Sequence, residues 1–85
     1  MLVERNRILT ETIKRLLRRG ADIRLKKITG KVHAADLSTV FPSLSASNQR
    51  KFFQLIEDPE KKGFVISELD EDIIHEIIET LPLRS

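Results

Sequence analysis

The fold class is decided by the stretch DEDIIHEIIETLP at residues 70–82. Its isoleucines return every three or four residues, the spacing at which side chains share one face of an α-helix. Asp70 is a residue type that caps helix N-termini, the acidic residues after it favour the positive end of the helix dipole, and Pro82 ends the pattern. The stretch therefore predicts an amphipathic helix with a broad apolar face.

The same apolar pattern occurs once more, 37 residues earlier in the chain. The two copies contain these positions: Leu37, Val40, Phe41, Leu44 and Ile74, Ile77, Ile78, Leu81. A constant shift of this size is typical of stacked helical repeats. Pro42 falls inside the earlier copy, where it is expected to bend or end the helix.

The N-terminal third also has helical spacing. Residues 3–19 are predicted to form a first amphipathic helix that ends at Gly20. Asp22 is expected to cap or charge the start of a shorter segment at residues 21–32, which Gly30 interrupts.

Two further elements are expected between the repeat copies. Ser45 is predicted to cap a helix that closes at Asp58-Pro59, and Asp58 is predicted to cap the next element. Residues 59–69 favour a helix or a short strand, because Gly63 and two β-branched residues lower their helix propensity. We therefore predict an all-α fold, with a single helical domain at residues 1–85 and one and a half helical repeats at residues 33–82.

The repeat is cut where a counterpart of the Ser45 helix would begin. The final helix is then expected to leave part of its apolar face, including Ile74 and Ile78, without a neighbour. Pairing with another domain or with a second copy would bury that face. The sequence predicts a dimer or larger oligomer at high micromolar concentration.

Composition excludes several classes of site. The chain has no cysteine, so it can form neither a disulfide nor a thiolate metal site. No apolar run approaches the roughly 20 residues of a membrane-spanning helix, and no signal peptide is visible. Neither nucleophile motifs nor phosphate-loop glycine patterns are present. We expect a cytoplasmic, non-catalytic protein.

Charge is divided unevenly along the chain. Residues 1–32 contain ten Lys and Arg against three acidic residues, a net charge of +7, so residues 33–85 carry −5. The candidate partner-binding cations on the first helix are Lys14, Arg15, Arg18 and Arg19. Binding of nucleic acid by this basic third is the alternative function. It is disfavoured because all four phenylalanines are predicted to lie in the core, away from the basic residues.

The final helix contains the only candidate metal ligands. Glu71, His75 and Glu79 recur every four residues and share one face, although a single helix rarely completes a coordination sphere. A solvated face with Glu–His pairing is the competing interpretation.

Several caps and core residues, in order and spacing, resemble the N-terminal domain of MgtE-type magnesium transporters. They are HAADL at residues 33–37, Pro59-Glu60, Leu69-Asp70 and Leu81-Pro82. The resemblance covers roughly residues 9–82. It implies a right-handed superhelix of short helices, related to the middle domain of the flagellar motor switch protein FliG.

The resemblance also implies a function. In that family the domain senses cytosolic Mg²⁺ through acidic residues at its interface with a CBS domain pair, and this docking favours the closed pore. The family's acidic position corresponds to residues 63–66 here, which contain no carboxylate. We therefore expect a regulatory module that docks on a CBS-type domain, a membrane transporter domain or a second copy, with Mg²⁺ as the ligand that the family suggests.

Overall fold

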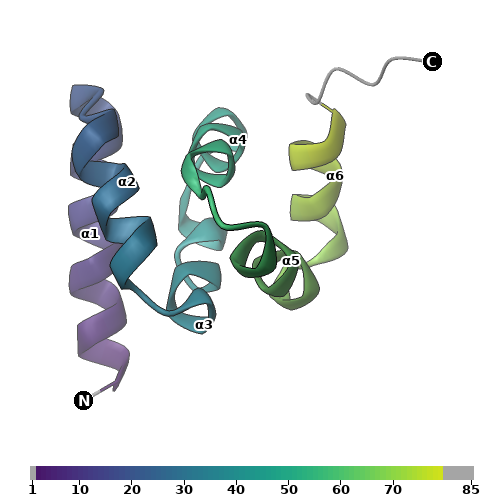
Figure 1. Ribbon diagram of the computed structural model, residues 1–85, viewed down its shortest axis with the longest axis horizontal. Helices are drawn as coiled ribbons and strands as arrows, with labels where there is room; N and C mark the ends of the chain where they lie inside the picture. Colours follow the sequence, from purple (N-terminus) through teal and green to yellow (C-terminus); the bar gives the residue numbers. More distant parts are fainter. Residues whose placement is uncertain (1, 80–85) are drawn as a thin grey trace.

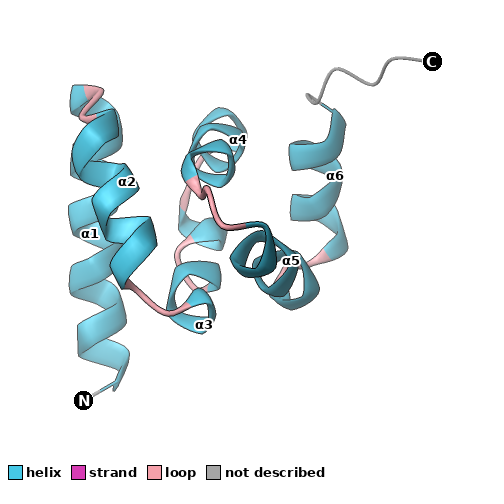
Figure 2. Cartoon of the chain, in the orientation of Figure 1, coloured by secondary structure: helices cyan, strands magenta, loops and turns pink. Residues whose placement is uncertain are grey.

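The computed structural model describes residues 2–79, and it describes side chains from residue 6 to residue 78. Its elements are α1 (Leu2–Arg19), α2 (Asp22–Lys31), α3 (Ala34–Ser38), the 3₁₀-helix η1 (Phe41–Ser43), α4 (Ala46–Leu55), α5 (Pro59–Glu68) and α6 (Glu71–Glu79). Short loops join them, and no strand occurs between residues 2 and 79 (Figure 2). The all-α prediction is confirmed, and the strand alternative for residues 59–69 is wrong.

The helix ends lie where the cap residues predict them. Gly20 ends α1 with a φ of +68°, a conformation that a residue with a Cβ atom rarely adopts. Ser45 Oγ accepts the Asn48 N–H at 3.3 Å, and Asp58 Oδ1 accepts the Glu60 N–H at 3.0 Å. These bonds satisfy amide groups that have no partner in the first turns of α4 and α5.

Two local predictions need correction. Of the two roles expected for Asp22, the capping role is wrong, because Ala21 occupies the N-cap of α2; Asp22 does place its charge in the first turn. Gly30 does not interrupt α2 but lies inside its last turn. The bend expected at Pro42 does occur: α3 ends at Ser38, and residues 41–43 form a separate 3₁₀ turn.

The helices pack in an alternating order. After the α1–α2 pair, the main contacts join α2 with α4, α3 with α5, and α4 with α6. The array is elongated, 44 × 25 × 22 Å, with α1 and α2 at one end and α6 at the other (Figure 1). Moreover, α5 has the ten-residue length of α2 and begins 37 residues later. This arrangement is consistent with a superhelical array, whose right-handedness stays a prediction.

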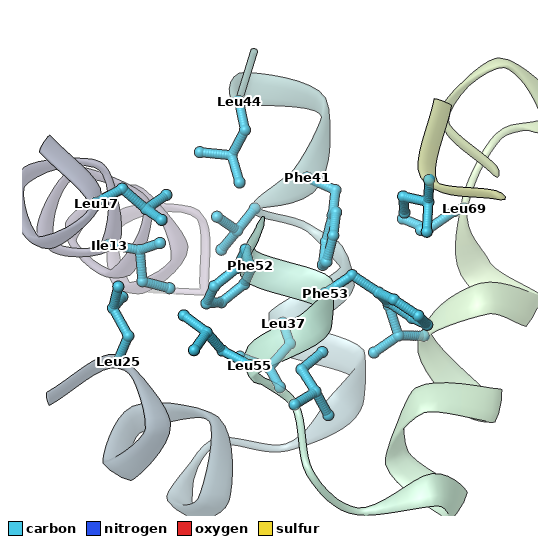
Figure 3. Packing of buried hydrophobic residues seen from close by; sticks show 14 of the residues in the cluster. Ile13, Leu17, Leu25, Leu37, Phe41, Leu44, Phe52, Phe53, Leu55 and Leu69 are labelled. Atoms are coloured by element: carbon cyan, nitrogen blue, oxygen red, sulfur yellow. The ribbon is translucent and has the colours of Figure 1, made fainter. Parts of the chain in front are cut away.

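One apolar core runs through the array (Figure 3). Phe41 and Phe52 are fully buried at its centre, with ring centroids 5.3 Å apart. Ile13 and Leu25 extend the core into the α1–α2 pair. Phe64 is the exception to the predicted aromatic core: it is 47% exposed on α5, because the adjacent Val65 occupies the buried side of that short helix.

Buried polar groups join the α1–α2 pair to the rest of the array. Thr29 Oγ1, which is buried, donates to the carbonyls of Lys26 at 2.8 Å and Leu55 at 3.4 Å. The half-buried Lys61 of α5 donates from Nζ to the carbonyls of Thr29 at 2.7 Å and Val32 at 3.0 Å. Lys61 thus satisfies carbonyls at the C-terminus of α2, where a cation also complements the helix dipole.

We predict that Lys61→Met lowers the free energy of unfolding by about 1–3 kcal/mol, because it leaves part-buried carbonyls without a charged donor. Urea denaturation followed by circular dichroism measures this change. Lys31→Met removes the same charge from an exposed position on α2 and is expected to stay within about 0.5 kcal/mol of the parent. Equal losses in the two variants would show that the α2 contact contributes nothing.

Candidate functional site

The apolar face of α6 is mostly covered. Ile77 is only 1% exposed, and Ile73 and Ile74 are partly buried against the core. Ile78 is 41% exposed. Helix α4 supplies the cover, and the Arg50 guanidinium of α4 pairs with the Glu76 carboxylate of α6 at 3.4 Å. The uncovered apolar surface expected from the cut repeat is therefore a narrow strip at Ile74 and Ile78.

The metal candidates on α6 do not form a preformed site among the described residues. Glu71 and His75 are both exposed, and the Glu79 side chain lies outside the described part. No group of three potential ligands that could hold an ion occurs among the described side chains. Residues 68–72 also carry an exposed acidic run at the α5–α6 junction: Glu68, Asp70, Glu71 and Asp72.

The basic candidates on α1 are separated into two groups. Arg15 and Arg19 line a cleft between α1 and α2, whereas Lys14 and Arg18 do not. The cleft has a volume of about 450 Å³. Its remaining lining comes from Thr12 and Leu16 of α1 and from Arg24, Lys27 and Ile28 of α2. We call it the cation cleft.

Sequence reasoning missed the cation cleft because the pairing of α1 with α2 is a tertiary contact. A signal was present in the spacing: the lining residues recur three and four apart on each helix, so each set shares one face. The neighbouring Lys26 is excluded from this face, and its Nζ lies 3.6 Å from a Glu57 carboxylate oxygen.

The described side chains offer no assembled nucleophile. Ser38 and Ser67 donate to carbonyls of their own helices at 2.7 Å, and Ser45 serves as a cap. Both histidines, His33 and His75, are exposed.

Within residues 2–79, no helix combines the length and the apolarity that crossing a membrane requires.

No curated protein and no solved structure matches the chain. A family model does match: the MgtE intracellular N domain, over residues 32–85. The matched range begins after α2, so it includes α3 to α6 and leaves out the α1–α2 pair. Because the match covers more than half of the 85 residues of this chain, the chain belongs to the MgtE intracellular N domain family.

Proposed function

We propose that this protein is a non-catalytic regulatory module that docks, through the outer side of α6, on another domain or subunit of an MgtE-type magnesium transporter. Family membership supports the regulatory, transporter-associated role, since this family is not a catalytic one. We infer the docking surface from one observation: Ile78 is half-exposed, although the other described apolar side chains of α6 are packed on the core.

The surface of α6 combines apolar and acidic groups. Ile74 and Ile78 form one line along the helix, four residues apart. Glu71 and His75 lie three residues before them and therefore form the adjacent line. We call these four residues the docking strip. A small apolar patch rimmed by polar groups is the usual composition of a reversible docking surface.

The net charge around α6 indicates what kind of partner surface would complement the docking strip. Residues 33–85 carry a net charge of −5, and the exposed carboxylates at residues 68–72 lie at the N-terminal end of α6. A partner with an apolar pocket and a basic or cation-bound rim would complement it. We propose a CBS-type domain of a magnesium transporter as this partner, as the resemblance to the MgtE N-terminal domain implies.

Other exposed isoleucines do not form a comparable surface. Ile8 is 65% exposed on α1 and Ile23 is 76% exposed on α2. Both lie outside residues 32–85, and single exposed apolar residues are ordinary on protein surfaces. Ile23 therefore provides a matched control for Ile78.

We predict that a CBS domain pair from an MgtE-type transporter, added to the isotope-labelled chain, shifts NMR signals of α6. Ile78→Lys should weaken this binding by about threefold or more, because docking would bury the 41% of Ile78 that is exposed, which contributes roughly 0.6–1.2 kcal/mol. Ile23→Lys makes the same chemical change on α2 and should leave the affinity unchanged.

Two outcomes would contradict this docking surface. One is an equal loss of affinity in both isoleucine variants, and the other is binding whose signal shifts are confined to α1 and α2. The unlabelled chain titrated into the labelled chain tests the second-copy alternative. Self-association through α6 would be abolished by Ile78→Lys as well.

Magnesium is expected to strengthen docking rather than to bind the free chain tightly. The exposed carboxylates at residues 68–72 repel one another and would repel an acidic partner, so a cation between them would favour docking. The described side chains of the free chain form no group of three ligands that could hold that cation alone. Ligands from both partners would therefore complete the coordination of a bridging ion.

We predict that millimolar Mg²⁺ tightens the complex by about fivefold or more relative to NaCl of equal ionic strength, a typical coupling between two ligands. The melting temperature of the free chain should differ little between the two salts. Equal dissociation constants in the two salts would remove Mg²⁺ from the proposal and leave the docking surface standing.

A further inference from the structure

The cation cleft concentrates positive charge without compensating carboxylates. Four of its lining side chains are cationic: Arg15, Arg19, Arg24 and Lys27. None of the side chains that line it is acidic, and none of the four cations forms an ion pair with another described side chain. Two nearby acidic groups pair with cations outside the cleft: Asp22 Oδ1 lies 3.3 Å from Lys51 Nζ, and Glu57 pairs with Lys26.

All four cations are exposed, so the packing of α1 on α2 does not require them at this cleft. Arg15 and Arg19 lie four residues apart on α1, a spacing at which like charges destabilise a helix. Pairing α1 with α2 brings Arg24 and Lys27 to the same cleft and adds further repulsion. Leu16, which is 7% exposed, and the partly buried Ile28 form an apolar part of the lining. A bound anion would relieve the repulsion between the cations.

We infer that the cation cleft binds a small anion that carries two or more phosphate groups. Three of the four cations are arginines, whose planar guanidinium groups match phosphate oxygens in pairs. The volume of about 450 Å³ falls in the range of small-ligand pockets. No aromatic side chain lines the cleft, so recognition rests on phosphates and not on stacking of bases.

This site is independent of the proposed docking function. The cleft is formed entirely by residues 12–28, which precede the family match at residues 32–85. The α1–α2 pair that lines it also lies at the opposite end of the array from α6 (Figure 1). Failure of docking at α6 would therefore leave the phosphate site untouched, and the reverse also holds.

The test uses inorganic tripolyphosphate as the probe, titrated into the full chain by calorimetry at physiological ionic strength. The double variant Arg24→Gln/Lys27→Gln removes two exposed cations from the cleft. The double variant Arg18→Gln/Lys31→Gln removes two exposed cations from the same two helices, outside the cleft. Both variants change the net charge equally, so the comparison separates the cleft from general attraction.

We expect saturable binding of one tripolyphosphate per chain. The cleft variant should weaken it by about tenfold or more, since two charge-assisted contacts are lost, and the control variant by about twofold or less. Equal weakening in the two variants, or no saturation at millimolar ligand, would overturn the inference. Citrate provides the ligand control: if this tricarboxylate binds as tightly as tripolyphosphate, the cleft is not a phosphate site.

Discussion

Helix length is the constraint on which the rest of this structure depends. Apart from α1, no helix between residues 2 and 79 exceeds ten residues, and α3 has only five. Helices of this length are marginal in water on their own. Each is therefore stabilised by the helix two positions along the chain, through the apolar core that runs from Ile13 to Ile77. Packing between these helices, more than local propensity, explains why α5 is helical despite Gly63 and its β-branched residues.

The same alternating helix contacts hold the cation cleft and the outer side of α6 within one array of helices. Lys61 and Thr29 join α2 to the segment that matches the MgtE intracellular N domain. A basic cleft at the α1–α2 end and an acidic, partly apolar helix at the other end are thereby held in the same array. A ligand that orders one end could influence the other only through these shared contacts. The separation of charge along the sequence thus becomes a separation in space.

Much of the fold could be predicted from local patterns. Apolar periodicity and the caps at Gly20, Ser45 and Asp58 located most helix boundaries, because these signals depend on neighbours within one turn. Contacts between distant residues were not predictable in this way. The Lys61–Thr29 bond spans 32 residues and has no periodic signature. Lys61 also donates to the Val32 carbonyl, so its two bonds lie on either side of Gly30. The cation cleft and the exposed Phe64 likewise depend on which helix faces which.

We infer that residues 2–79 form one cooperative array in which the α1–α2 pair and the family segment stabilise each other. Native-state hydrogen exchange tests it most directly, because it measures the free energy of opening at each amide. In a single cooperative array, the most protected amides of α2, α4 and α5 open with the same free energy, equal to that of global unfolding. Exchange of α2 at a much lower free energy than α4 and α5 would show instead that the α1–α2 pair and the family segment fold separately.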